Sequence, residues 1–298
     1  MPTTSRGQEL LSPDFLAQLE RLALLSRRSF RGRVKGERRS PRKGISVEFS
    51  DYRPYGLGDD LRYVDWNIYG RLDRLYVKLF VDEEDLCLNI LLDASASMAF
   101  GSPSKLAYGA RLAAGLGFVG LVNLERVGVS MVREERLSEG VGPSRGRSQI
   151  LPLMDFLSRV RPAGGTSLNQ ALGAWGLRTR EPGLAVLISD LMDPAGYERG
   201  LKSLLEHRHD LHVVHLLAAE EMNPVWGGDL RLEDAESGET RDLTLDAESM
   251  RVYRGRLHDF LERAEGFCRA NEIGYHRVVT DTPVEEFMLR ELKGFLVG

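Results

Sequence analysis

Hydrophobic positions recur along the chain with two different periods. In residues 14–29 they fall every three or four positions, which is the spacing of an amphipathic helix. Residues 45–49, 63–69 and 75–81 instead alternate between apolar and polar side chains, which predicts short β-strands. We therefore expect an N-terminal helix that packs on another part of the protein, followed by a small β-rich unit.

From Cys87 onward, continuous apolar runs alternate with helical segments. This pattern is typical of a parallel sheet that is covered by helices on both faces. The predicted strands are 88–92, 127–132, 184–188, 211–217 and 273–279. The predicted helices are 105–125, 148–160, 167–178, 196–207, 248–271 and 284–295, with a polar hairpin at 229–246. The sequence thus predicts an α/β protein with a doubly wound, mostly parallel sheet.

Length and composition agree with a folded protein of one or two domains. The chain has 298 residues, 42% of them hydrophobic, which is enough to bury a substantial core. The changes of pattern predict an N-terminal helix and basic loop (1–43), a β-rich unit (44–85) and an α/β domain (86–298). The last of these is predicted to carry a polar hairpin insertion near 227–246.

Charge is distributed unevenly. The formal net charge is only −4, yet residues 27–43 contain nine basic residues and one acidic residue. Such a segment is a candidate for nucleic-acid binding. Because Phe30 is its only aromatic residue for base stacking, we favour a solvated surface loop.

Cysteine use and the N-terminal composition favour a cytoplasmic protein. Cys87 and Cys268 are the only cysteines, and Cys87 begins a predicted buried strand, which argues against a disulfide scaffold. The first thirty residues include acidic side chains and lack the apolar stretch of a signal peptide. The longest charge-free helical stretch, 112–124, is too short to cross a bilayer.

Oxygen-bearing side chains stand where the predicted strands end. Asp93, Ser95 and Ser97 follow the first strand of the α/β region, Thr166 precedes a helix, and Asp190 follows the third strand. Open parallel sheets bind ligands beyond the carboxyl ends of their strands. Residues two apart in a loop that leaves a strand can turn to the same side, so one short segment can present three oxygens to one point. Hard divalent cations take such ligands, and we predict a site for Mg²⁺ or Mn²⁺.

This set resembles the metal-ion-dependent adhesion site of von Willebrand factor A domains, in which D-x-S-x-S is followed by a distant Thr and a distant Asp. Asp93, Ser95 and Ser97 match the first element, Thr166 the second and Asp190 the third. The resemblance implies a von Willebrand factor A-like fold that binds a partner's carboxylate through the cation. In the alternative interpretation, Ser97 caps a helix and Asp93 forms a turn, without any metal.

A second resemblance covers about residues 44–190. The run Y-R-P-Y-G-L-G-D-D-L-R-Y-V-D-W-N-I-Y-G-R at 52–71, with Y-V-K at 76–78 and E-E at 83–84, resembles the signature of a bacterial family, domain of unknown function fifty-eight (DUF58). In that family the signature precedes a von Willebrand factor A-like segment. The resemblance implies association with MoxR-type AAA+ ATPases. Many members carry N-terminal membrane helices that this chain lacks, so no membrane role is carried over.

The signature contains a dense set of charged and aromatic residues. Its most prominent members are Asp59, Asp60, Arg62, Asp65, Trp66 and Arg71. Buried charges need partners, so we favour an ion-pair network that ties the unit to the main domain. A partner-binding surface is the alternative.

Two other motifs are interpreted as structural. Ser102-Pro-Ser-Lys105 fits S-x-x-K, but the companion motifs of serine acylases are absent, and Ser104 suits a helix cap. The four histidines between 207 and 215 straddle a helix end and a strand, where successive positions face different ways. We therefore do not expect them to bind a metal together.

Three classes of function remain open. We favour a non-enzymatic, metal-dependent protein-binding module that acts as an adaptor for a MoxR-type ATPase. A magnesium-dependent hydrolase using Asp93 as nucleophile or metal ligand is the first alternative, although no general base is evident near the strand ends. Nucleic-acid binding through residues 27–43 is the second.

Overall fold

The computed structural model of the chain describes residues 10–33, 49–80, 87–123, 125–133, 136–179, 182–224, 227–236 and 238–297. It divides into two compact units. One comprises Met1–Ser29 together with Leu86–Gly298, and the other comprises Phe30–Asp85.

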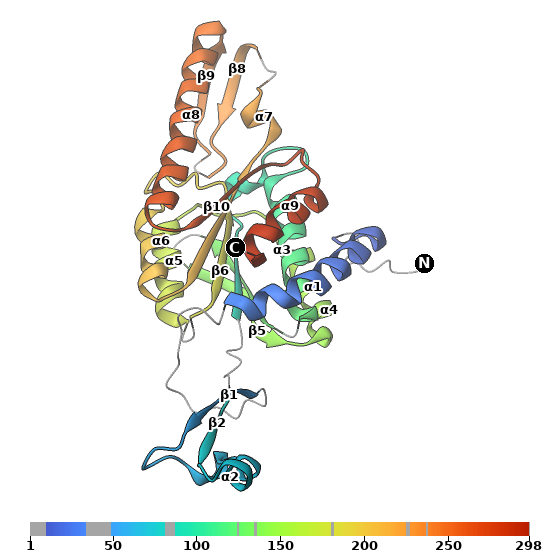
Figure 1. Ribbon diagram of the computed structural model, residues 1–298. Coiled ribbons are helices and arrows are strands. Elements are labelled where there is room, and N and C mark those ends of the chain that lie inside the picture. Colours follow the sequence, from blue (N-terminus) through green and yellow to red (C-terminus); the bar gives the residue numbers. More distant parts are fainter. Residues whose placement is uncertain are drawn as a thin grey trace. The chain divides into compact units, whose positions relative to one another are not determined.

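The larger unit is built on a six-stranded sheet (Figure 1). Its strands are β3 (Cys87–Asp93), β4 (Arg126–Arg133), β5 (Arg136–Arg145), β6 (Leu184–Ser189), β7 (Asp210–Leu217) and β10 (Gly274–Val279). Their order is β10-β7-β6-β3-β4-β5, and only β5 runs antiparallel to its neighbour. If these six strands are numbered 1 to 6 in chain order, their order in the sheet, read from β5 to β10, is 3-2-1-4-5-6. This is the strand order of doubly wound folds. The predicted fold class is confirmed.

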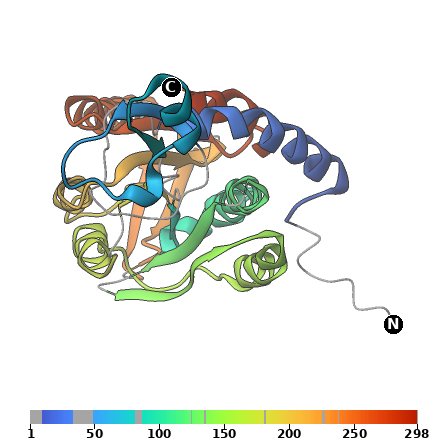
Figure 2. The same cartoon turned by 60° about the horizontal axis from the view of Figure 1, so that its bottom comes forward.

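Helices cover both faces of this sheet (Figure 2). One face packs against α5 (Leu168–Arg178), α6 (Glu198–Glu206) and α8 (Ala247–Ala270). The other packs against α3 (Lys105–Val122), which in turn contacts α4 (Ile150–Arg159) and α9 (Val284–Val297). Because β3 and β6 have helices on both faces, every residue of both strands is buried. This explains why these strands are continuous apolar runs in the sequence.

Glycines in α3 let the central helix approach its neighbours closely. A Cβ at Gly109 would lie only 3.0 Å from Leu92 of β3. A Cβ at Gly115 would overlap Met288 of α9 and lie 3.4 Å from Phe15 of α1 (Pro13–Arg33). The predicted N-terminal helix is therefore confirmed, and it packs on α3. By length and composition α3 itself would suffice to cross a membrane, but 83% of it is buried inside the fold.

The smaller unit contains less strand than the sequence predicts. β1 (Phe49–Pro54) pairs antiparallel with β2 (Tyr76–Phe80), which confirms the strand expected at 75–81, while 45–48 lie outside the described residues. The strand expected at 63–69 is wrong. This segment holds the end of a short 3-10 helix, η2 (Leu61–Tyr63), and most of helix α2 (Trp66–Leu72).

The carboxylate of Asp65 is the reason for the helix at 66–72. It accepts hydrogen bonds from the backbone N–H groups of Asn67, at 2.9 Å, and of Ile68, at 3.3 Å. Such an N-cap satisfies donors that the first turn of a helix leaves unpaired. The cap outweighs the alternation of apolar and polar residues on which the strand prediction rested.

Three further segments complete the fold. Strand β5 was not predicted, because Gly140, Gly142 and Pro143 are poor strand formers, yet it pairs along β4 at the edge of the sheet. The predicted polar hairpin is confirmed as β8 (Gly228–Glu233) and β9 (Thr240–Leu245). A short helix, α7 (Ala219–Met222), follows β7.

The basic segment is only partly described. The backbone of residues 27–33 continues α1, where the sequence analysis places the start of a loop. Arg and Ser do not break helices, so the helix persists past its amphipathic part. Residues 34–43 lie outside the described residues.

Candidate metal centre

The candidate site lies where the sheet changes direction of winding. Asp93 is the last residue of β3, and Asp190 directly follows β6, its neighbour in the sheet. The chain continues from β3 to β4 on one side, whereas β7 lies beyond β6 on the other. A doubly wound sheet opens a crevice at such a switch point. The fold thus brings together carboxylates that are 97 positions apart.

Hydrogen bonds connect four of the five predicted ligand residues. Ser95 Oγ lies 3.1 Å from Ser97 Oγ, and Ser97 Oγ donates to Asp190 Oδ2 at 2.9 Å. Asp93 Oδ1 accepts from the Ser95 backbone N–H at 3.0 Å, and Asp93 Oδ2 accepts from Ser189 Oγ at 2.6 Å. Asp93 therefore does form a turn, as the alternative interpretation expected. Ser97 does not cap a helix, because its hydroxyl points to Asp190.

Thr166 lies in a loop beside the D-x-S-x-S segment, but its side chain is hydrogen-bonded to a residue outside the predicted set. Two backbone hydrogen bonds, Ala96 N to Gly164 O at 2.9 Å and Ala163 N to Ala94 O at 3.0 Å, hold its loop against the D-x-S-x-S segment. In the described part of the chain, no hydrogen bond joins Thr166 directly to the other four residues. Its hydroxyl donates instead to Glu236 Oε1, at 2.5 Å.

The site contains a buried lysine that the sequence analysis missed. Lys105 is fully buried, and its Nζ lies 2.7 Å from Asp190 Oδ2 and 2.6 Å from Glu221 Oε1. Burial alone disfavours the ammonium, but the charges of Asp190 and Glu221 outweigh it and raise the pKa of Lys105. The lysine is therefore protonated. Ser104 does cap α3, accepting from Ala107 N at 3.2 Å, so the cap interpretation of S-x-x-K is confirmed but incomplete.

Glu221 was also missed, although the sequence held a signal for it. It lies four positions after the end of β7, the strand next to β6, and so belongs to the same edge of the sheet. Its other carboxylate oxygen accepts from Ala218 N at 2.7 Å, which caps the short helix α7. A carboxylate just beyond the carboxyl end of β7 is the sequence signal for this residue.

The charge of the cluster leaves room for a cation. Burial first, and then the neighbouring Asp190 carboxylate, raise the pKa of Asp93 to about 6. The cluster holds three carboxylates, Asp93, Asp190 and Glu221, and one buried ammonium, that of Lys105, which pairs with Asp190 and Glu221. Buried negative charge needs compensation, so the oxygen donors fit a divalent cation. Ser97 and Thr166 are only half-buried, which leaves this side of the site open to solvent.

The histidines do not form a metal cluster. His207 contacts Ser203 O at 2.7 Å, whereas His212 lies 3.1 Å from His276. Among the described residues, no three His, Cys, Asp or Glu side chains are arranged as a metal site on their own. The hydrogen-bond partners of His207 and His212 are thus separate.

His215 holds the backbone of Asp190 in place through a hydrogen bond. Burial lowers its pKa to about 4, so it is neutral. Its Nε2 lies 2.9 Å from the carbonyl oxygen of Asp190, which only accepts, so Nε2 carries the proton. Nδ1 then accepts from the Tyr275 hydroxyl at 2.8 Å. This chain of contacts fixes the backbone that presents Asp190.

The charged residues of the signature pair within the smaller unit. Arg53 binds Asp59 at 2.6 Å, and Arg62 binds Asp60 at the same distance. Their side chains are exposed or half-exposed, so this is not the buried network that the sequence predicts. Asp65 is the buried member, with Lys78 Nζ at 3.0 Å.

Two members of the predicted set stand on α2 and are exposed. Trp66 is 60% exposed and packs edge-to-face on Tyr69, with ring centroids 6.2 Å apart. Arg71 lies one turn further along the same helix and is also exposed. The partner-binding interpretation of this set stays a prediction.

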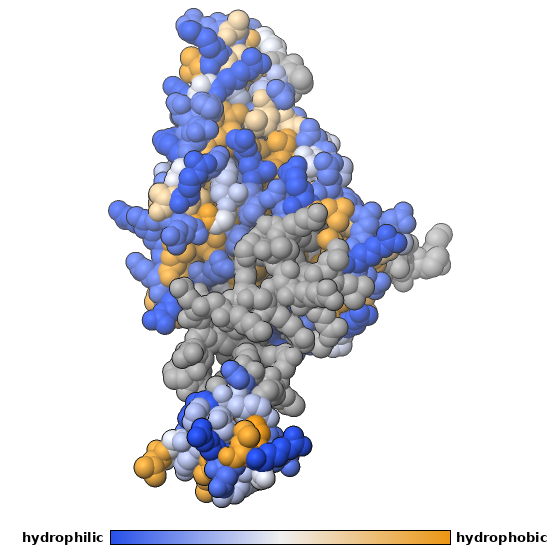
Figure 3. Space-filling view, in the orientation of Figure 1, coloured by the Kyte–Doolittle hydropathy of each residue, from blue (hydrophilic) through white to orange (hydrophobic). Residues whose placement is uncertain are grey.

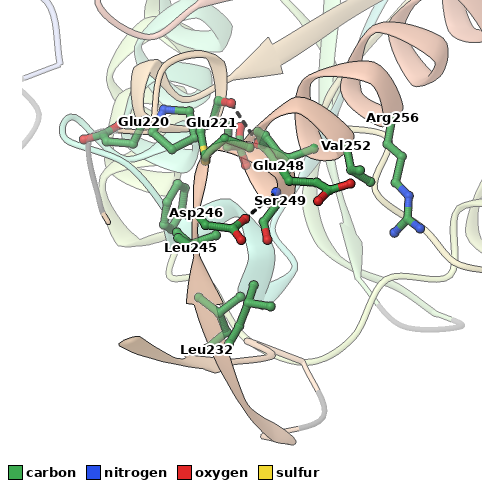
Figure 4. Close-up of a pocket in the computed structure, with 14 residues that line it drawn as sticks. Glu220, Glu221, Leu232, Leu245, Asp246, Glu248, Ser249, Val252 and Arg256 are labelled. Carbon is green, nitrogen blue, oxygen red and sulfur yellow. Dashed lines mark hydrogen bonds between the residues drawn. The ribbon is translucent and has the colours of Figure 1, made fainter. Parts of the chain in front are cut away.

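An apolar groove adjoins the candidate metal centre (Figure 4). It has a volume of about 580 Å³ and lies between the β8–β9 hairpin, the first turns of α8 and α7. Its apolar lining includes Leu232, Leu243, Leu245, Met250, Val252 and Tyr253. Glu221 and Phe100 line the groove, and both also contact Lys105. In Figure 3 hydrophobic residues are exposed among hydrophilic ones where the hairpin and α8 lie.

Carboxylates dominate the polar rim of this groove. Glu220, Asp246 and Glu248 lie on it, against a single basic residue, Arg256. Within the described residues, Glu220 Oε2 accepts no hydrogen bond although that oxygen is buried. A ligand that combines apolar groups with a positive charge would complement this surface.

Comparison with known proteins identifies the family. The profile of the family described as "Protein of unknown function DUF58" matches residues 51–258, and the chain belongs to this family. The uncharacterized protein Rv1480 of Mycobacterium tuberculosis is 26% identical over 249 residues, which cover 82% of this chain and 78% of that protein. An uncharacterized protein of Mycobacterium bovis, Mb1516, matches with the same identity and coverage.

Two solved structures illustrate the structural neighbours. The conserved hypothetical protein BatB from Bacteroides thetaiotaomicron has a TM-score of 0.44 and 17% identity, covering 72% of this chain and 100% of that one. The manganese-loaded TRAP protein of Plasmodium vivax has a TM-score of 0.33 and 20% identity, covering 45% of this chain and 58% of that one.

Proposed function

We propose that this protein is a non-enzymatic, metal-dependent protein-binding module. The observation that supports this most directly is the cluster of oxygen donors at the switch point of the sheet, with more buried carboxylates than cations. Asp93, Ser95, Ser97, Thr166 and Asp190 would hold Mg²⁺ or Mn²⁺, which would supply the positive charge that attracts a partner's carboxylate. The half-buried Ser97 and Thr166 mark the side from which that carboxylate would arrive.

The surroundings of the site favour binding over hydrolysis. Asp93 is held in place by two hydrogen bonds, from Ser95 N and Ser189 Oγ, which suits a fixed ligand of a cation. The one histidine in contact with the site, His215, faces the backbone of Asp190 and not the ligand side chains. Glu236 is the described carboxylate nearest the open side, and both of its oxygens already accept hydrogen bonds from Thr166. A magnesium-dependent hydrolase remains the alternative function.

We further propose that the partner is a MoxR-type AAA+ ATPase, and that the apolar groove receives part of it. Membership of the DUF58 family supports the choice of partner. The groove supports a protein ligand, because apolar side chains such as Leu232 and Leu243, both more than 40% exposed, gain free energy when a partner covers them. The acidic rim favours a segment of the ATPase that carries Lys or Arg beside its apolar residues.

The proposal is tested with the MoxR-type ATPase encoded by the same genome. We expect association in Mg²⁺ and a loss of at least tenfold in affinity after addition of EDTA, or in Asp93→Asn, which keeps the shape of the side chain. Asp259→Ala, on an exposed part of α8, is the matched control and should bind like wild type. Association that survives both EDTA and Asp93→Asn would show that the metal centre is not the binding site.

The groove is tested in the same assay. Leu243→Asp places a charge among its apolar side chains and should weaken association by about tenfold or more. Leu289→Asp puts the same charge on a Leu of α9 with equal exposure, 41%, outside the groove. Equal affinity of both variants would remove the groove from the interface. Hydrolysis of phosphate esters that is lost in Asp93→Asn would instead favour the hydrolase.

A further inference from the structure

A carboxylate of the protein itself already occupies the Thr166 end of the candidate site. Glu236 Oε1 accepts from Thr166 Oγ1 at 2.5 Å, and Glu236 Oε2 accepts from Thr166 N at 3.0 Å. The two residues are 70 positions apart in sequence. One residue thus offers two donors to the two oxygens of one carboxylate, an arrangement in which charge-assisted hydrogen bonds are strong and directional.

The turn that carries Glu236 is shaped to present it. Asp234 Oδ1 accepts from Glu236 N at 3.0 Å, and Asp234 O accepts from Gly238 N at 2.8 Å. Gly238 has a φ of +71°, which L-residues with a side chain rarely adopt. In the described part of the turn, from 231 to 240, Glu236 is the one side chain that is half-buried, while the others are exposed. The hairpin therefore directs a single carboxylate inward.

We infer that Thr166 is the carboxylate-binding position of this site and that Glu236 fills it as an internal ligand. The inference rests on the proposed function in one respect, since a partner's carboxylate must displace Glu236 to reach Thr166. Because Glu236 is tethered, it competes at an effective concentration on the order of millimolar. Only a partner that binds the protein elsewhere as well, for example in the groove walled by the same hairpin, overcomes this competition.

The inference is tested with acetate, the simplest carboxylate, while the Thr166 amide is observed by NMR on the full chain. In wild type the amide proton should stand downfield, as expected of a donor to a carboxylate, and acetate should change it little. In Glu236→Ala we expect an upfield shift of that resonance. Acetate should then move it back, with a midpoint on the order of tenfold lower than in wild type.

Matched variants separate the contact from general effects on the hairpin. Glu233→Ala removes an exposed carboxylate from β8 of the same hairpin and should behave like wild type. Glu236→Asp keeps the charge on a shorter side chain and should give an intermediate acetate midpoint. Since Glu233 is exposed and Glu236 is only half-buried, we expect all three variants to fold.

The outcome is independent of whether the metal-dependent function is correct, because every titration is run in Mg²⁺ and in EDTA. A Thr166 resonance unchanged in Glu236→Ala would overturn the inference, and so would equal acetate midpoints in wild type and variant. The expected shifts without any effect of Mg²⁺ would uphold the internal ligand and count against the metal centre alone.

Discussion

Lys105 Nζ lies 2.7 Å from Asp190 Oδ2, and both side chains are completely buried. The ammonium also binds Glu221, so it links the ends of β6 and β7 to the first residue of α3. Removing one partner of a buried pair leaves an uncompensated charge. The free energy that this costs is larger than the net stabilisation that the intact pair provides. We expect Lys105→Met to lower the free energy of unfolding by about 3–5 kcal/mol, measured by urea denaturation.

The matched control for Lys105 is an exposed ion pair. Arg159 and Asp155 lie 2.7 Å apart on α4, with side chains 73% and 56% exposed. Arg159→Met should change stability by less than about 1 kcal/mol, because water screens exposed pairs. If the cation site exists, Mg²⁺ should restore part of the stability that Lys105→Met loses. A loss below about 1 kcal/mol in Lys105→Met would contradict the buried-pair argument.

Gly115 provides a second stability prediction, which concerns the packing of α3 against α9 and α1. A Cβ at this position would overlap the sulfur of Met288. Gly115→Ala should therefore destabilise the fold by about 1–3 kcal/mol. Gly173 of α5 is the comparison, because a Cβ there meets no atom within 4 Å. Gly173→Ala should stabilise by about 0.4–1 kcal/mol, and thermal unfolding that ranks the two variants in the opposite order would refute the packing model.

The parts of the fold that follow a single strong pattern could be predicted from the sequence. Buried strands such as 184–188 are unbroken apolar runs, and the helix at 248–271 has a clear amphipathic period, so both appear as predicted. The segment 63–69 could not be predicted in this way, because one cap by Asp65 decided between strand and helix. Strand β5 takes its conformation from β4, and its own residues give no signal.

The candidate site, too, could be predicted from the sequence only in part. The motif placed Asp93, Ser95, Ser97 and Asp190 correctly at adjacent strand ends, because the topology of a doubly wound sheet fixes where strand ends lie. Lys105 had the sequence signature of a helix start, and nothing local showed that its ammonium would be buried. The contact of Glu236 with Thr166 depends on how the hairpin folds back, which is a long-range property.

The smaller unit allows a prediction about pH. The Lys78 ammonium, 3.0 Å from Asp65 Oδ2, is the main reason that the pKa of Asp65 is lowered to about 2. A carboxyl group with a depressed pKa stabilises the folded state above its unfolded pKa, about 4. This contribution is lost as the pH falls from about 4 through 2. Carboxyl NMR should give a titration midpoint near 2 for Asp65 and a midpoint closer to 4 in Lys78→Met.

The choice of cation is the most direct test of the candidate centre. Its donors are two carboxylates and three hydroxyls, Asp93, Asp190, Ser95, Ser97 and Thr166. Such all-oxygen sets favour Mg²⁺ and Mn²⁺, whereas zinc sites are built mainly from nitrogen and sulfur ligands. Calorimetry at neutral pH should therefore show binding of Mn²⁺ and Mg²⁺, with no preference for Zn²⁺ beyond the general order of affinities for divalent metals.

Two variants connect that binding to individual residues. Asp93→Asn removes a charge from the buried donors, so it should abolish the calorimetric signal, while the exposed Asp259→Ala should leave it unchanged. Ser97→Ala should weaken binding without abolishing it, because it deletes one neutral donor and leaves both carboxylates in place. Equal heats for wild type and Asp93→Asn would exclude this cluster as a metal centre. Lys105 and its buried partners would then be a purely structural feature of the sheet edge.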